Sequence, residues 1–72
     1  MRVFVNGEEM EMLPRLYFAQ VVRAAFGCVY IDDGAYTVTF VGDKAGRGTL
    51  KPREWIGTED GMRFVVQETA RP

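Results

Sequence analysis

The sequence contains no histidine and only one cysteine, Cys28. Without histidine, the chain cannot build the Ser-His or Cys-His pairs that activate a nucleophile, and it lacks the commonest transition-metal ligand. One cysteine cannot form a disulfide within the chain, so nothing indicates an oxidising compartment. No cationic cluster adjoins Cys28 in the sequence, and we interpret it as a small apolar residue just past a helix end.

Runs of basic residues and long apolar stretches are also missing. The nine Lys and Arg residues are scattered along the chain and are balanced by ten Asp and Glu residues, for a net charge of −1. A nucleic-acid-binding protein needs clustered cations, so we do not expect that function. The apolar stretches are far shorter than the ~20 residues of a membrane span. The N-terminal residues also lack the pattern of a signal peptide, so we expect a cytoplasmic protein.

A chain of 72 residues forms one domain with a small core. A core of this size supplies only about 3–5 kcal/mol of stability. The hydrophobic content of 47% and the charged content of 26% are typical of a folded protein.

Residues 1–13 predict a β-hairpin. Asn6-Gly7 is a strong signal for a two-residue turn, because both residues tolerate positive φ. A two-residue turn sets a register in which most apolar residues of both strands lie on the inner face. The expected pairs are Val3 with Met10 and Met1 with Met12 on the inner face, and Arg2 with Glu11 and Phe4 with Glu9 on the outer face.

One helix is predicted to follow Pro14, which ends the second strand because it has no N–H to donate. No Ser, Thr, Asp or Asn marks the helix start, which we place between Leu16 and Phe18. Gly27 suits the left-handed residue that closes a helix. The apolar face of this helix consists of Phe18, Val21, Val22 and Ala25.

Two longer strands and one short strand are predicted in the second half. Tyr36–Val41 alternates, with Thr37 and Thr39 on its outer face, and the last strand places Val65 outward while its alternate residues Met62, Phe64 and Val66 face inward. Between them, Gly42–Gly48 is expected to be a hairpin loop. A short strand begins at Thr49–Leu50 and is interrupted by Pro52, and Trp55-Ile56 is expected to form a short apolar anchor. We interpret Trp55 as a cap on the open end of the core, with a binding anchor as the alternative.

This order, strand–strand–helix–strand–strand, predicts the α+β class and a β-grasp, in which one helix packs on a mixed sheet. Residues 1–68 are expected to form the single domain, and residues 69–72 a C-terminal tail. If residues 16–26 formed only a helical turn, a small all-β barrel of the SH3-like kind would be the alternative.

In these elements and their order, the chain resembles a ubiquitin-like domain, specifically the bacterial multiubiquitin type. The residues that carry the resemblance are Val5-Asn6-Gly7, Val21-Val22-x-x-Ala25, Tyr36-Thr37-Val38-Thr39-Phe40, Gly48-Thr49-Leu50, Gly61-Met62-x-Phe64-x-Val66 and Thr69. The resemblance implies a protein modifier, or a recognised ubiquitin-like partner, of a system with E1-like, E2-like or protease components. The alternative is a non-catalytic interaction or self-assembling protein, with homo-oligomers formed through edge strands or the outer face.

Two sets of partner-binding residues follow from the resemblance. The tail residues would enter an E1-like or protease cleft as an extended strand, although a tail without a terminal Gly-Gly makes glycine-based conjugation unexpected. The outer sheet face would bind a protein partner. The tail set is Thr69, Ala70, Arg71 and Pro72, and the outer-face set is Phe4, Thr37, Thr39 and Val65.

No pattern predicts catalysis, a cofactor or a metal, so we do not expect an enzyme. Asp32-Asp33 and Glu59-Asp60 each lie next to a glycine and lack the ligand spacing of a calcium loop, which favours turns. The glycines of Gly42–Gly48 do not match a phosphate-binding loop, because no Gly-Lys-Ser/Thr sequence follows them.

Overall fold

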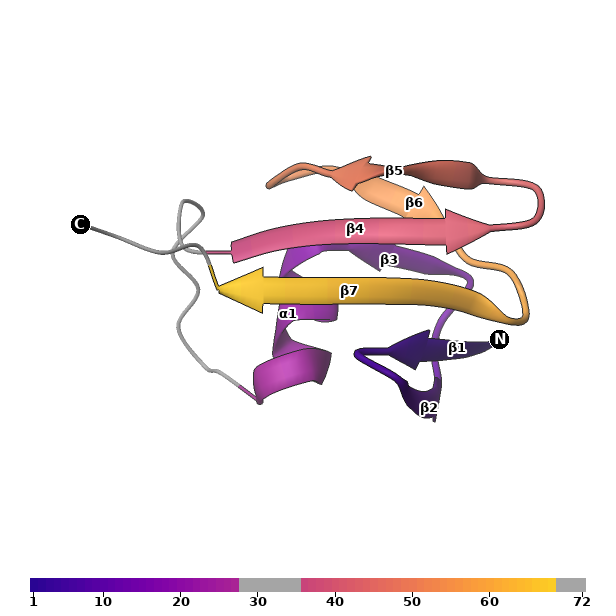
Figure 1. Ribbon diagram of the computed structural model, residues 1–72, viewed down its shortest axis with the longest axis horizontal. Helices are drawn as coiled ribbons and strands as arrows, with labels where there is room; N and C mark the ends of the chain where they lie inside the picture. The colour runs from indigo at the N-terminus through magenta and orange to yellow at the C-terminus, as the bar shows by residue number, and fades with distance from the viewer. Residues whose placement is uncertain (28–35, 69–72) are drawn as a thin grey trace.

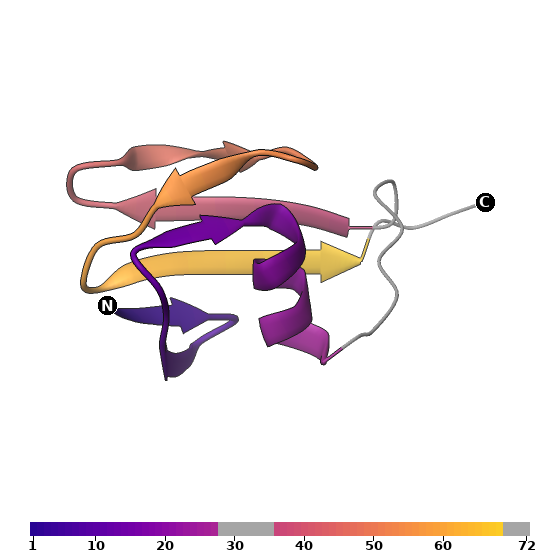
Figure 2. The same cartoon turned by 180° about the vertical axis from the view of Figure 1, so that it is seen from behind.

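A computed structural model of the protein describes residues 1–27 and 36–68. One helix packs on one face of a mixed five-stranded sheet with the strand order β2-β1-β7-β4-β5 (Figures 1 and 2). Two further strands, β3 and β6, form a small antiparallel sheet. The elements are β1 (Arg2–Val5), β2 (Glu8–Glu11), β3 (Arg15–Tyr17), α1 (Phe18–Phe26), β4 (Tyr36–Gly42), β5 (Gly46–Leu50), β6 (Trp55–Gly57) and β7 (Met62–Glu68).

The β1–β2 hairpin has the predicted register. Val3 lies opposite Met10, Arg2 opposite Glu11, and Phe4 opposite Glu9. The turn residues have positive φ, 52° at Asn6 and 84° at Gly7, as a type I′ turn requires. The hairpin prediction is therefore confirmed.

The Asn6 side chain also extends the pairing of β1 with β7. Its Oδ1 accepts the Val66 N–H at 2.8 Å, and its Nδ2 donates to the Val66 carbonyl at 3.2 Å. The side-chain amide of Asn6 therefore makes the hydrogen bonds to β7 that a backbone peptide group of β1 would make if the strand continued past the turn. The pattern of the sequence predicted the turn but not this side-chain contact.

Helix α1 begins at Phe18, at the C-terminal end of the range that the sequence allowed. A residue inside the helix satisfies one N–H group at its N-terminus, because Gln20 Oε1 accepts the Tyr17 N–H at 2.8 Å. Gly27 closes the helix with φ 68° and donates its N–H to the Arg23 carbonyl. A helix of nine residues on a mixed sheet excludes the all-β barrel alternative.

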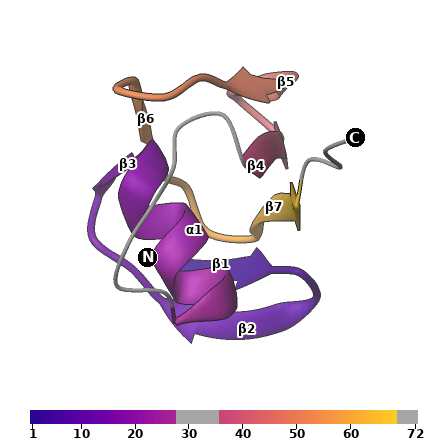
Figure 3. The same cartoon turned by 90° about the vertical axis from the view of Figure 1, so that its left-hand side faces the viewer.

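Strand β7 is the central strand of the sheet. It runs parallel to β1 and antiparallel to β4, and β4 in turn pairs with β5. The inward residues of these strands meet the helix in one core. Figure 3, a view along the strands, shows α1 on one side of the sheet. The buried apolar residues are Val3, Val5, Leu16, Phe18, Val21, Val22, Val38, Leu50, Met62, Phe64 and Val66.

Two predictions for the connecting segments were wrong. The residues after Pro14 and the Trp55-Ile56 anchor form strands β3 and β6, in which Leu16 lies opposite Ile56. Strands of three residues are too short to show a period-2 pattern, so only their pairing reveals them. The expected loop Gly42–Gly48 contains only residues 43–45 outside the strands, because β4 extends to Gly42 and β5 begins at Gly46.

Candidate functional site

The four predicted outer-face residues do share one face of the sheet, opposite α1. Thr39 pairs with Val65, Thr37 lies next to them on β4, and Phe4 is on the neighbouring strand β1 beside β7. Val65 is 47% exposed, Thr37 is exposed, and Phe4 and Thr39 are half-buried. Thr39 Oγ1 donates to the Val65 carbonyl at 3.5 Å, a weak contact that leaves the hydroxyl available to a partner.

Val41 is a member of this face that the sequence analysis missed. It is 43% exposed and lies between Arg63 on β7 and Arg47 on β5. Continuing the alternation of Tyr36–Val41 to its last residue would have placed Val41 outward with Thr37 and Thr39.

We call this surface the open sheet face and define it by Phe4, Thr37, Thr39, Val41, Arg63 and Val65. Across the strands, Phe4, Arg63 and Val41 are successive neighbours, and Val65 and Thr39 form the next pair. Small apolar areas therefore alternate with a guanidinium group and hydroxyl groups. This chemistry suits contact with a protein, because arginine and apolar side chains provide binding energy and hydroxyls provide direction.

A second exposed surface lies on the outer side of β3 and β6. Leu13 is 62% exposed, Trp55 52% and Tyr17 45%, and the Arg15 guanidinium lies 4.5 Å from the centre of the Trp55 ring. We call these four residues the ribbon face. The predicted role of Trp55 as a cap on the core was wrong, since the neighbouring residue Ile56 packs on the core instead. The sequence could not show this surface, because residues 15–17 meet residues 55–57 only through long-range pairing.

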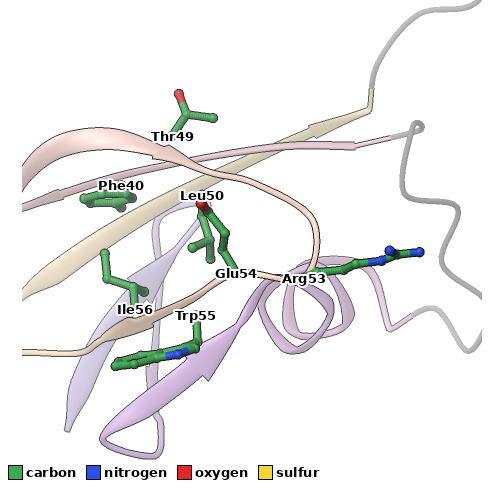
Figure 4. A pocket seen from close by; sticks show the side chains of 7 residues that line it. All are labelled: Phe40, Thr49, Leu50, Arg53, Glu54, Trp55 and Ile56. Carbon is green, nitrogen blue, oxygen red and sulfur yellow. The ribbon is translucent and has the colours of Figure 1, made fainter.

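A cleft of about 450 Å³ separates β5 from β6 (Figure 4). Phe40, Leu50 and Ile56 point into it, whereas the Arg53 side chain points away. The Glu54 carboxylate at its edge accepts the Lys51 N–H at 2.9 Å. The cleft is therefore lined by polar and apolar groups in similar measure, but its charged groups do not converge on a ligand, because Arg53 points away and Glu54 is engaged by a backbone N–H.

The carboxylates of Glu59 and Asp60 accept hydrogen bonds from backbone N–H groups of other segments, in agreement with their interpretation as turn residues. Glu59 Oε2 accepts the N–H of Ala45 at 2.9 Å and that of Lys44 at 3.2 Å, and Asp60 Oδ1 accepts the Arg2 N–H at 2.9 Å. The hydrogen bonds from Ala45 and Lys44 lower the pKa of Glu59 below its ordinary value. Within residues 1–27 and 36–68, no three His, Cys, Asp or Glu side chains are grouped so that they could hold a metal ion.

At the edge of the sheet, an ion-pair network surrounds Arg2. Its Nη1 lies 2.9 Å from Glu9 Oε2, and its Nε lies 4.0 Å from Glu11 Oε1. The hydrogen bond to Glu9, with the nearby negative charges, raises the pKa of the Arg2 guanidinium. All three side chains are exposed, so the network contributes little to stability.

Three predictions lie outside the described residues: the role of Cys28, the Asp32-Asp33-Gly34 turn and the tail set Thr69–Pro72. In the described part of the chain, no helix is long and apolar enough to cross a bilayer. No protein-family model matches the sequence, and comparisons with curated proteins and with solved structures give no match either. A functional assignment must therefore come from the surfaces themselves.

Proposed function

We propose that this protein is a ubiquitin-like β-grasp protein that acts by being bound, as a modifier or a recognised partner of E1-like, E2-like or protease components. The observation that supports this most is the sheet order β2-β1-β7-β4-β5 with helix α1 placed in the chain between the first hairpin and β4. That arrangement agrees with the β-grasp plan that the sequence predicted. It covers one face of the sheet and leaves the open sheet face for partners.

The composition of the open sheet face supports recognition by a protein. Val41 and Val65 each expose nearly half of their surface on a rigid, hydrogen-bonded sheet, so little conformational entropy is lost on binding. Arg63 lies between Phe4 and Val41 and can pair with a carboxylate of the partner. The tail residues 69–72 remain the proposed second contact, one that would enter a partner's cleft.

A pull-down from the native host tests this proposal. Tagged wild-type protein should capture an adenylating E1-like enzyme, an E2-like enzyme or a protease of such a system, identified by mass spectrometry. A second sample washed in denaturant separates covalent attachment, which gives a ladder of heavier species, from non-covalent recognition.

Paired variants make the pull-down specific for the surface. Val65→Glu places a charge on the open sheet face and should abolish the capture, whereas Trp55→Ser on the ribbon face should leave it intact. Both residues are about half exposed, so neither change is expected to unfold the protein. Capture of these enzymes that survives Val65→Glu, or their absence from the wild-type sample, would contradict the proposal.

A further inference from the structure

The five-stranded sheet has two edges of different chemistry. Strands β2 and β5 lie at opposite ends of the sheet (Figure 3), and neither pairs with a second strand among the residues that the structure describes. Each therefore presents a row of backbone N–H and C=O groups on its outer side. Such a row is a template for another strand unless side chains prevent the pairing.

The β2 edge is acidic. Three of its four residues, Glu8, Glu9 and Glu11, are exposed carboxylates. Their cationic neighbours are Arg2, 2.9 Å from Glu9, and the amino group of Met1, 2.8 Å from Glu11. Exposed ion pairs of this kind are weak, so these carboxylates can exchange their partners for cations of another chain.

The β5 edge has the opposite character. The strand carries Arg47 and no carboxylate, and it is flanked by Lys44 and Lys51. Two of the carboxylates next to it are already engaged, because Glu54 accepts the Lys51 N–H and Glu59 accepts the Lys44 and Ala45 N–H groups. The third, Asp43, lies in the turn before the strand, next to Lys44. Two β5 edges therefore repel each other, as do two β2 edges, whereas one β5 edge attracts one β2 edge.

We propose that the protein associates head to tail with copies of itself, through pairing of β5 of one molecule with β2 of the next. The strand directions allow this pairing without a change of orientation. Because β1 and β7 are parallel and the other neighbours are antiparallel, β2 and β5 run in opposite directions within one molecule. A second molecule in the same orientation thus adds an antiparallel strand and keeps its helix on the same side of the extended sheet.

The side chains of the two edges also match. On the face away from the helix, β5 presents Arg47 and Thr49, and β2 presents Glu9 and Glu11. A register with Arg47 opposite Glu11 also places Thr49 opposite Glu9. The same register brings the half-buried Met10 to Gly48 on the other face.

Gly48 offers Met10 a suitable neighbour. A Cβ at Gly48 would lie 2.9 Å from Cζ of the Phe40 ring, so the ring already covers this glycine. The thioether of Met10 would pack beside that ring, a favourable contact for sulfur.

This contact joins two different surfaces, so it does not close in a dimer. It gives a ring if the rotation between copies closes and a filament if it does not. Successive open sheet faces would lie on the same side of the extended sheet, so a partner with several binding sites would bind more tightly than one with a single site. This assembly is independent of the proposed recognition by E1-like, E2-like or protease components.

Two charge-reversed variants test the proposal. One carries Glu9→Lys and Glu11→Lys on β2, and the other carries Arg47→Glu and Thr49→Glu on β5, all at exposed positions. Masses are measured by light scattering from about 10 μM to about 1 mM protein. The wild-type mass should rise with concentration from 8.2 kDa, and the association constant should fall at least about tenfold between about 20 mM and about 500 mM salt.

Each variant alone should remain at the monomer mass, because its two edges then carry the same charge. An equimolar mixture should associate again, since each edge of one variant is complementary to an edge of the other. The control Arg63→Glu makes the same charge reversal as Arg47→Glu, but on the central strand, and should associate like wild type. A wild type that stays monomeric throughout, or a mixture that does not recover, would overturn the proposal.

A second measurement does not depend on the folding of the variants. Dilution of ¹⁵N-labelled wild-type protein should shift the amide signals of residues 8–11 and 46–50. Shifts confined to the ribbon face would place self-association at another surface and would also overturn the proposal.

Discussion

Asn6 has two separate functions in the hairpin. It adopts a left-handed conformation with φ 52°, and its side chain makes both hydrogen bonds to Val66. A turn residue often contributes only its backbone conformation, but the side chain of this asparagine also connects the first hairpin to the last strand. Substitution of Asn6 should therefore lower the free energy of unfolding by more than the loss of the turn conformation alone.

Asn6→Gly should separate these two functions. Glycine keeps the positive φ but removes both bonds to Val66, so we expect the free energy of unfolding to fall by about 1–2 kcal/mol. Asn6→Asp keeps an acceptor for the Val66 N–H but places a carboxylate against its carbonyl, and it should also destabilise. Urea unfolding measures both, and an Asn6→Gly variant as stable as wild type would show that the side-chain bonds contribute nothing.

Arg53 also has a positive φ, and its value of 73° is unfavourable for a residue with a Cβ. It follows Pro52 in a turn closed by the Glu54 N–H and the Lys51 carbonyl at 3.0 Å, an arrangement that favours glycine at this position. Arg53→Gly should therefore stabilise the protein by about 0.5–1 kcal/mol. Arg53→Ala keeps the Cβ and is the control, and thermal unfolding should show no gain for it.

The β4–β5 hairpin is held to the loop before β7 by one carboxylate. Glu59 accepts amides of the 43–45 turn and lies against Gly42, where a Cβ would be 2.8 Å from Glu59 Oε2. The lowered pKa of Glu59 means that the folded state favours the ionised form. Its contribution to stability is therefore complete above the ordinary pKa of 4.5 and is lost as the pH falls through the lower pKa of the folded state.

Glu59→Gln should consequently destabilise the protein at neutral pH, and its difference from wild type should shrink in acid below pH 4.5. Gly42→Ala should displace the same carboxylate, so the double variant should be little worse than the worse single variant. Unfolding midpoints measured across pH test both statements. A difference between Glu59→Gln and wild type that does not change with pH would contradict this role of the carboxylate.

The longer elements could be predicted from the sequence because their patterns are local. The Asn6-Gly7 turn set the hairpin register, and alternation placed Thr37, Thr39 and Val65 on one face. Strands β3 and β6 could not be predicted, since three residues show no period and their pairing joins distant segments. The ribbon face depends on that pairing and was missed with it, whereas Val41 was visible in the alternation and was overlooked.

At the scale of the whole molecule, the two faces of the sheet differ, because the helix covers only one of them. One face holds the core around Phe64 and Val38, and the other exposes Val41 and Val65 beside Arg63. The two ends of the sheet differ again, with carboxylates on β2 and Arg47 on β5. A partner and a second copy therefore have different surfaces to bind, and both can be present at once.

The most direct test of the open sheet face as the partner-binding surface is a titration of ¹⁵N-labelled protein with the E1-like, E2-like or protease component that the pull-down recovers. The amide signals that shift most should belong to Phe4, Val41, Arg63 and Val65, on the open sheet face. Shifts centred instead on Leu13, Tyr17 and Trp55 would show that partners bind the ribbon face, and would contradict the central claim.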